Sequence, residues 1–178
     1  MIAGKGTPEL APSRLKAYAD PAFMSALLNR LEDASVSYLI EQFKAGIDAA
    51  QIFESFAGAL PAPLLEPYSF GPISRIIQRV RAVIPSARFI VFCRNAGFHH
   101  QSVRQKTGAN AVALDWSVDE QWARQVIQKH GPVQGHLDPL LLVQGGDLLK
   151  VRAQTIVEAF SDGPHIFNLG PVSYTHLR

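Results

Sequence analysis

The chain has 178 residues, of which 47% are hydrophobic and 18% charged, a balance that is typical of a globular domain and excludes a disordered chain. Its formal net charge is only +2, and no basic run interleaved with aromatic residues indicates a nucleic-acid-binding surface. A single cysteine, Cys93, excludes an intrachain disulfide framework. Because the sequence also shows no signal segment and no apolar run of membrane-spanning length, we expect a cytoplasmic protein without nucleic-acid or membrane partners.

The N-terminal part of the sequence predicts an irregular stretch followed by a long helix. Glycines and prolines recur over residues 1–18 and argue against a long element there. Asp20 and Pro21 then form a typical helix start, with the aspartate as N-cap and the proline at the first helical position. We expect the helix to end at Gly46 and to carry Glu32 on its solvated face. Its buried face is predicted from the apolar residues at helical spacing, Phe23, Leu27, Leu31, Ala34, Tyr38, Leu39 and Phe43.

Five short apolar runs predict strands, with helices between them. The strands are expected at residues 52–55, 89–92, 111–114, 133–135 and 165–169. The helices are expected at residues 73–84, from about 99 to 108, from a capping box at 117–120, and at 149–160, with a proline-rich connection at 61–72. Such β-then-α units need crossover connections and therefore predict a parallel α/β sheet. About five units leave open an incomplete (β/α)8 barrel or an open doubly wound sheet, and no Gly-x-Gly-x-x-Gly follows the first strand to indicate a dinucleotide site.

Polar residues follow several of the predicted strands. Glu54 and Ser55 stand where the first apolar run would otherwise continue, which is how a parallel α/β fold presents working side chains, although a plain loop explains them too. No Gly-x-Ser-x-Gly elbow surrounds Ser55, so a hydrolase nucleophile is not indicated. Asp115 and Asp138 also end strands, where they border the same predicted pocket as Ser55 or cap the helices that follow.

A metal site is not predicted. Cys93, His99 and His100 lie close together in the sequence, but neighbouring histidines on a helix point in different directions. A zinc site needs three or four ligands, and the sequence has no second cysteine. We therefore interpret the two histidines as an exposed pair.

Four motifs in order resemble the successive strand-end motifs of the uroporphyrinogen decarboxylase family. They are Gln-Ile-Phe-Glu-Ser-Phe-Ala-Gly (51–58), Ala-Leu-Asp-Trp (113–116), Val-Gln-Gly-His-Leu-Asp-Pro (133–139) and Phe-Asn-Leu-Gly (167–170). The resemblance covers residues 1–170 and implies a (β/α)8 TIM barrel, here incomplete, with about five C-terminal units. It also implies a homodimer without a cofactor, which converts the four acetate side chains of uroporphyrinogen III to methyl groups and yields coproporphyrinogen III for haem biosynthesis.

The resemblance also assigns site residues. Ser55 matches a serine that contacts a substrate carboxylate, and Arg94, at a strand end, is a second candidate for such a contact. Asp115 and Asp138 are further candidates for the substrate site. No catalytic residue is assigned, because the family's arginine loop and aspartate would precede Met1 and its tyrosine would stand just before it.

The C-terminus departs from the family pattern. The family's His-Gly would follow Gly170, but residues 171–178 match nothing in the family and are interpreted as a foreign tail, so His176 is not taken for the missing histidine. We therefore expect the chain alone to be inactive. Two alternatives stay open: a zinc-dependent corrinoid or coenzyme M methyltransferase of the same fold, and a non-catalytic tetrapyrrole-binding remnant. The first would show His-x-Cys, but Val91 occupies the histidine position two before Cys93.

Overall fold

The computed structural model describes residue 2 and residues 8–170 of the chain, which leaves the predicted foreign tail, His176 included, outside the described residues. The described part opens with a short turn, η1 (Pro8–Leu10), and helix α1 (Ala11–Ala19). The prediction of an irregular stretch up to residue 18 is therefore wrong for α1. Pro12 lies in the first helical turn, where a backbone N–H would have no partner within the helix, so the proline does not disrupt it.

Helix α2 (Pro21–Lys44) begins as the sequence predicts, because the Asp20 carboxylate accepts a hydrogen bond of 3.0 Å from the Phe23 N–H. The predicted buried face is only partly right: Leu39 is buried, whereas Phe23 is 44% exposed. Glu32, expected in solvent, is only 3% exposed. The guanidinium of Arg75 donates two hydrogen bonds of 2.9 and 2.6 Å to its carboxylate, and this partner makes the buried charge tolerable.

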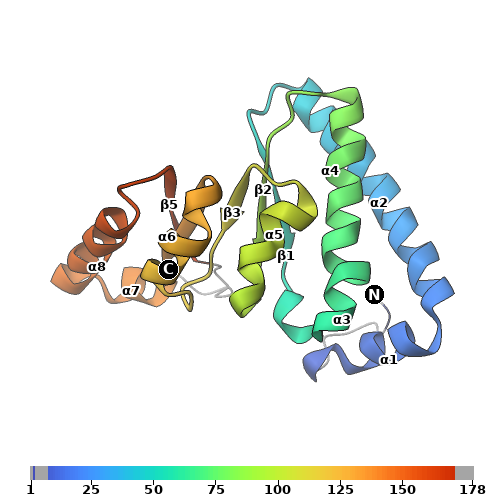
Figure 1. The fold of residues 1–178 in the computed structure, drawn as a ribbon, viewed down its shortest axis with the longest axis horizontal. Coiled ribbons are helices and arrows are strands. Elements are labelled where there is room, and N and C mark those ends of the chain that lie inside the picture. The colour runs from blue at the N-terminus through green and yellow to red at the C-terminus, as the bar shows by residue number, and fades with distance from the viewer. Residues whose placement is uncertain (1, 3–7, 171–178) are drawn as a thin grey trace.

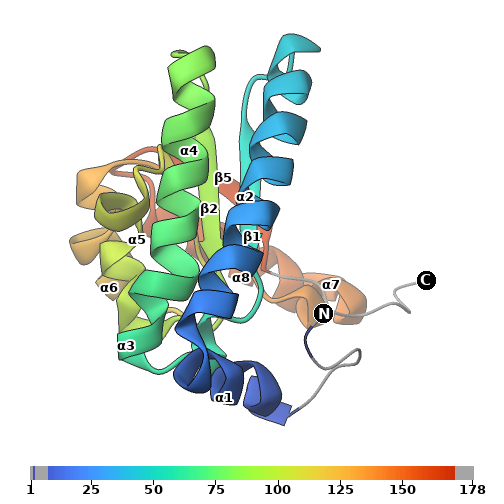
Figure 2. The same ribbon diagram turned by 90° about the vertical axis from the view of Figure 1, so that its right-hand side faces the viewer.

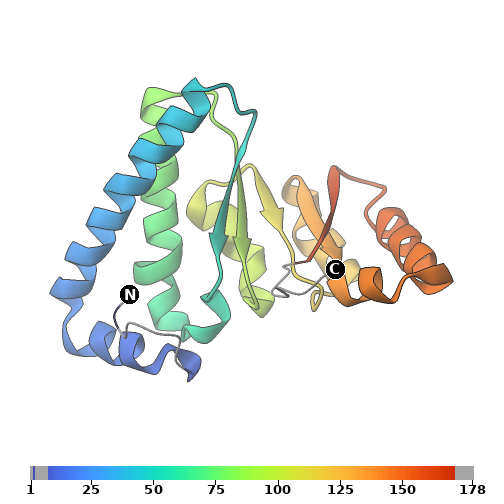
Figure 3. The same cartoon turned by 180° about the vertical axis from the view of Figure 1, so that it is seen from behind.

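The sheet is entirely parallel and its strands follow one another in chain order, β1-β2-β3-β4-β5. An order that never reverses is that of a barrel and excludes the doubly wound alternative, in which the order reverses at a switch point. Figures 1 and 3 show the sheet from its two sides. The five predicted strands are confirmed as β1 (Ala50–Glu54), β2 (Phe89–Cys93), β3 (Ala111–Ala113), β4 (Val133–Leu137) and β5 (His165–Leu169).

Helical segments connect the strands. The expected helices at 73–84, 99–108 and 149–160 are confirmed, whereas the proline-rich connection contains two short helical segments and the start of a third helix, because its prolines lie at helix starts. The capping box is wrong: Asp119, not Ser117, caps the next helix by accepting the Trp122 N–H at 2.8 Å. In order, the segments are η2 (Ala57–Ala59), α3 (Ala62–Leu65), η3 (Glu66–Phe70), α4 (Gly71–Val83), η4 (Gly97–His99), α5 (His100–Thr107), α6 (Glu120–Val126), η5 (Gln128–His130), α7 (Pro139–Gln144) and α8 (Gly146–Ala159).

The main core lies between the sheet and the helices that cover it. Residues of β2 and α4 such as Phe89, Val91, Ile77 and Val80 are fully buried there, and α2 packs beside α4 over the same region (Figure 2). Among the described residues, β1 and β5 each pair with one strand only, so each has one edge without a strand partner. No helix in this part of the chain is long and apolar enough to span a membrane.

Candidate functional site

The structure brings the four sequence-predicted site residues to one edge of the sheet. Ser55 directly follows β1, Arg94 follows β2, Asp138 follows β4, and Asp115 stands two residues after β3. In a parallel sheet the carboxyl ends of all strands lie on the same side, and this is where (β/α) barrels carry their working groups. The topology therefore places the four residues together, but their side chains differ in what they contact.

A hollow of about 240 Å³ opens on the sheet face and draws its lining from all five strands. Its polar side chains are the neutral amides of Gln51, Gln134 and Asn168, and the Gln134 Nε2 donates to the Gln51 Oε1 at 3.2 Å. This contact joins β1 to β4, two strands that do not pair, so the sheet curves and this face is its concave side. The full lining is Gln51, Phe53, Phe92, Ala113, Leu114, Gln134, Gly135, Asn168, Leu169 and Gly170.

None of the four predicted site residues lines this hollow. Sequence reasoning missed the three amides, although Gln51 and Gln134 are polar residues that directly follow an apolar residue at the start of a predicted strand region. Two-residue alternation places Gln51 on the same sheet face as Phe53. The hollow is thus a second candidate surface, beside the strand-end loops.

Ser55 is exposed in a turn whose position is fixed by its neighbours. The Glu54 carboxylate accepts the Phe56 N–H at 2.9 Å, a contact that spans Ser55. The Gly58 N–H donates to the Arg94 carbonyl at 3.0 Å, which ties this turn to the loop after β2. A Cβ on Gly58 would lie 2.5 Å from the carbonyl oxygen of Asn95, so the two loops touch too closely for any other residue.

Asp115 is buried and its carboxylate contacts only protein groups. One oxygen accepts the Asn95 N–H at 2.8 Å and lies 3.4 Å from the His100 Nε2; the other accepts the N–H of Ser117 at 3.2 Å and also its hydroxyl. Burial alone would raise the pKa of Asp115, but the hydrogen bonds from His100, Ser117 and Asn95 outweigh it and hold the pKa well below its usual range.

The expectation of an exposed histidine pair is wrong for His100, which has no exposed surface. The Asp115 carboxylate supplies the partner that allows this ring to be buried, because an ionised carboxylate accepts the ring N–H. His99 is half-buried and stacks on Phe98, with ring centroids 4.1 Å apart.

Asp138 and Arg94 have partly structural surroundings. The Asp138 side chain caps α7 by accepting the Leu140 N–H at 2.9 Å, so its helix-capping role is confirmed. Its contact with a substrate stays a prediction. The half-buried Arg94 donates its backbone N–H to the Glu54 carbonyl at 2.9 Å, while its buried Nε has no hydrogen-bond partner among residues 2 and 8–170.

Cys93 does not offer a thiolate at this edge. Burial, reinforced by the nearby Glu54 carboxylate, raises the pKa of its thiol to about 12, so the sulfur stays protonated at neutral pH. Burial also raises the pKa of Glu54 itself, against the opposing hydrogen bond from Phe56. Within the described residues, no group of three or more His, Cys, Asp or Glu side chains is placed to hold a metal ion.

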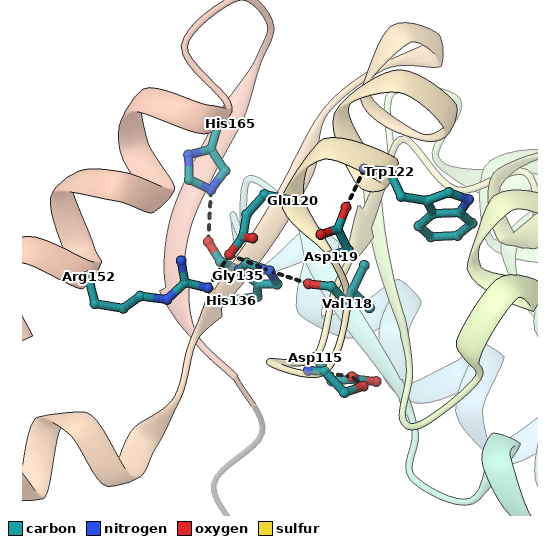
Figure 4. A network of polar contacts seen from close by, with 10 residues as sticks. Asp115, Val118, Asp119, Glu120, Trp122, Gly135, His136, Arg152 and His165 are labelled. Atoms are coloured by element: carbon teal, nitrogen blue, oxygen red, sulfur yellow. Dashed lines mark hydrogen bonds and ion pairs between the residues drawn. The ribbon is translucent and has the colours of Figure 1, made fainter.

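His136, which belongs to one of the quoted motifs, is held by a polar network on the helix side of β4 (Figure 4). Its Nε2 donates to the Val118 carbonyl at 2.9 Å and lies 3.5 Å from the Glu120 carboxylate, which in turn pairs with Arg152 of α8. Burial lowers the pKa of His136, so the ring is neutral at pH 7. The network joins β4, α6 and α8 and lies outside the hollow.

A parallel sheet in sequential order, with helices over one face and polar loops at its carboxyl ends, defines the chain as part of a (β/α)8 barrel. Comparison with known families makes the assignment specific. The chain belongs to the uroporphyrinogen decarboxylase family, because the model of the family described as "Uroporphyrinogen decarboxylase (URO-D)" matches residues 1–172. The fold predicted from the resemblance, an incomplete TIM barrel, is thereby confirmed.

Several bacterial proteins named uroporphyrinogen decarboxylase are similar to the chain. That of Agrobacterium fabrum is 50% identical over 170 residues, which are 96% of this chain and 49% of the relative. Those of Brucella anthropi and Brucella canis are 49% and 48% identical, over 96% of this chain and 50% of each relative. The chain thus spans about half the length of the curated relatives it matches.

Proposed function

We propose that the chain supplies the C-terminal strand ends of a uroporphyrinogen decarboxylase, a carboxy-lyase that converts uroporphyrinogen III to coproporphyrinogen III. The identity of about half of 170 aligned residues to enzymes of that name carries this proposal. The arrangement of Ser55 and Arg94 at one sheet edge supports it. We further propose a cytoplasmic homodimer for the complete enzyme.

In the reaction that this function requires, the pyrrole ring serves as the electron sink. Protonation of a ring carbon makes the ring cationic, and the bond between the acetate methylene and its carboxylate then breaks. Carbon dioxide leaves, and the bonding electron pair moves into the ring, which leaves an exocyclic methylene. A proton added at the methylene carbon completes the methyl group, and loss of the first proton from the ring carbon restores the neutral pyrrole. The protein has to bind an anionic macrocycle, exclude water and stabilise the changing charge.

Two side chains of this chain suit the binding of carboxylates. The exposed hydroxyl of Ser55 can donate a hydrogen bond without adding charge. The Arg94 Nε is a buried donor without a partner among the described residues, and leaving such a donor unpaired costs free energy. A substrate carboxylate would instead meet the terminal nitrogens of the half-buried guanidinium and form a charge-assisted hydrogen bond with them.

The test is to put residues 1–170 in place of the matching residues of the Agrobacterium fabrum relative, so that the relative supplies both the upstream half and the His-Gly that the family places after Gly170. Formation of coproporphyrinogen III from uroporphyrinogen III by this fused protein is then followed. We expect this fused protein to turn over and the chain of 178 residues alone to be inactive. Ser55→Ala in the fused protein should lower kcat/KM by up to about a hundredfold, because a hydrogen bond to a charged group contributes about 1.5–3 kcal/mol. Complete loss of activity with an intact fold would instead assign chemistry to Ser55.

The same fused protein separates the two alternatives. A zinc-dependent methyltransferase would carry about one zinc ion per chain, whereas we expect no stoichiometric zinc by elemental analysis. A non-catalytic tetrapyrrole-binding remnant would bind uroporphyrinogen but release no coproporphyrinogen. A folded fused protein that binds the substrate without turnover would therefore overturn the proposed function.

A further inference from the structure

Asp115 connects the loops that follow three neighbouring strands. Its own loop follows β3, and its carboxylate accepts the N–H of Asn95 in the loop after β2. That loop in turn accepts the Gly58 N–H, through the Arg94 carbonyl, from the turn that contains Ser55. Two consecutive hydrogen bonds, joined by the Arg94–Asn95 peptide, therefore run from a buried carboxylate to the two residues proposed to bind substrate carboxylates.

Asn95, the residue in the middle of this series of contacts, has an unfavourable backbone conformation. Asn95 has a φ of 55°, in the left-handed region that L-residues other than glycine seldom adopt. Its N–H is the group that Asp115 holds, at 2.8 Å. The close contact of Gly58 with the Asn95 carbonyl means that a shift of Asn95 has to move the first loop as well.

The carboxylate suits this task because donors approach both of its oxygens. Asn95 and His100 lie against one oxygen, and the N–H and hydroxyl of Ser117 lie against the other. An asparagine in this place would turn its NH2 group toward donors whichever way the amide were oriented. The site therefore requires an acceptor on both sides, which only an ionised carboxylate of this length provides.

We propose that Asp115 is a positioning residue, which fixes the loops after β1 and β2 and thereby sets where Ser55 and Arg94 stand relative to the substrate. This inference rests on the proposed function for the part that concerns substrate. The coupling of the loops does not depend on it. Asp115 itself touches no substrate, because its side chain is 1% exposed.

The coupling is tested on the chain of 178 residues by amide hydrogen exchange at pH 7. In Asp115→Asn we expect exchange at Asn95 and Gly58 to accelerate about tenfold or more. The Asn95 N–H loses its charge-assisted hydrogen bond, and the Gly58 N–H is bonded to the carbonyl of the adjacent residue, Arg94. The matched control is Asp119→Asn, the same change four residues later, where the carboxylate accepts a single backbone N–H and asparagine is an equally good N-cap. It should exchange like the wild type at both amides.

A second variant keeps the test decisive if Asp115→Asn does not fold. In Asp115→Asn with Ser117→Ala the short contact with the hydroxyl is gone, so only the backbone N–H of residue 117, 3.2 Å away in the wild type, still faces the new NH2 group, while the amide oxygen accepts the Asn95 N–H. We expect this double variant to recover part of the protection at Asn95 and Gly58. Accelerated exchange at Asn95 with unchanged exchange at Gly58, in either variant, would overturn the coupling of the loops.

The effect on substrate is measured in the fused protein. Because Ser55 and Arg94 are proposed to hold carboxylates in both ground and transition states, Asp115→Asn should raise KM about tenfold and change kcat much less. Asp119→Asn should leave both constants unchanged. If the fused wild type does not turn over, the proposed function fails, and exchange alone decides the coupling. If it turns over and Asp115→Asn has wild-type constants, the positioning role fails by itself.

Discussion

Helices α4 and α8, which follow β1 and β4, are held to the sheet in different ways. α4 has 13 residues and buries five of them, among them Ile77 and Val80, whereas α8 has 14 and buries only Ile156. α4 has α2 on one side and α5 on the other. In the described part of the chain α8 packs against α6, α7 and β4, and Val151 on its outer face is 62% exposed. The burial of a helix in this protein thus depends on its neighbours and not on its length.

The two helices also differ in how much their attachment depends on polar contacts. The Arg75–Glu32 pair joins α4 to α2 beside a large apolar contact, so it adds to a helix that is already fixed. The Arg152–Glu120 pair and the nearby His136 join α8 to α6 and β4 beside a single buried residue of α8, Ile156. The first region is therefore stabilised mainly by apolar burial, and the second depends more on groups that respond to pH.

The largest difference between the regions is expected for core truncation. Ile77→Ala removes a side chain with no exposed surface and should lower the free energy of unfolding by about 2–5 kcal/mol, measured by urea titration. Val151→Ala, its control on the outer face of α8, should change it by less than about 0.5 kcal/mol. An equal loss of unfolding free energy in both variants would show that the outer face of α8 is covered in solution and that the two helices do not differ in burial.

A smaller effect is expected for the ion pairs of α4. Arg75→Ala leaves the Glu32 carboxylate buried without its partner and should cost about 1–3 kcal/mol, reduced from a fully buried pair because Arg75 itself is half exposed. Arg79→Ala breaks an exposed pair with Asp33 and should cost less than about 1 kcal/mol. If the two variants were equally stable, the buried carboxylate would not depend on Arg75.

The smallest effect, and the one that distinguishes the regions by pH, is expected at His136. Its pKa is lowered by burial, so the fold favours the neutral ring; the stabilisation is complete above the unfolded value near 6.5 and is lost as pH falls below it. One proton contributes at most about 1.4 kcal/mol per pH unit. Relative to the intrinsic rate at each pH, we expect amide exchange in α6, β4 and α8 to accelerate as pH falls below about 6.5.

Other titrating groups provide the controls. The ionisable side chains that face His136 are Glu120, Arg152 and His165. Glu54 has a raised pKa, so its effect is opposite to that of His136 and it stabilises the region of β1 as pH falls. Asp115 has a lowered pKa, so its contribution to stability is lost only below its unfolded pKa near 3.9. His136→Gln, which can still donate to the Val118 carbonyl, should remove the acceleration. If the acceleration persists in this variant, another group causes it.

Much of the fold could be predicted from the sequence. Apolar runs bounded by residues such as Pro85 and Gly108 gave the strands and the limits of α4 and α5, because burial and chain-breaking residues act locally. Two of the errors, the predicted exposure of Glu32 and of His100, occur where a distant partner decides. Glu32 is buried because of Arg75, 43 residues away, and His100 because of Asp115, 15 residues away. No local pattern carries that information.

The candidate site was predictable to a similar degree. Strand ends in a parallel sheet share one edge whatever the details, so the placement of Ser55 and Arg94 there follows from topology. The hollow did not follow, because the contact between Gln51 and Gln134 depends on how far the sheet curves. The substrate contacts of Ser55, Arg94 and Asp138 stay predictions, and for Asp115 the proposed positioning role takes the place of a direct contact.

The close approach at Gly58 has a consequence for how this loop tolerates sequence variation. Gly46, with a φ of 98° and open space around it, needs glycine for its backbone alone, so asparagine is a workable substitute there. Gly58 has no room for even a methyl group, because the Asn95 backbone and Cβ occupy that space. In a saturation library selected for folded protein, position 46 should therefore return glycine and asparagine, whereas position 58 should return glycine alone.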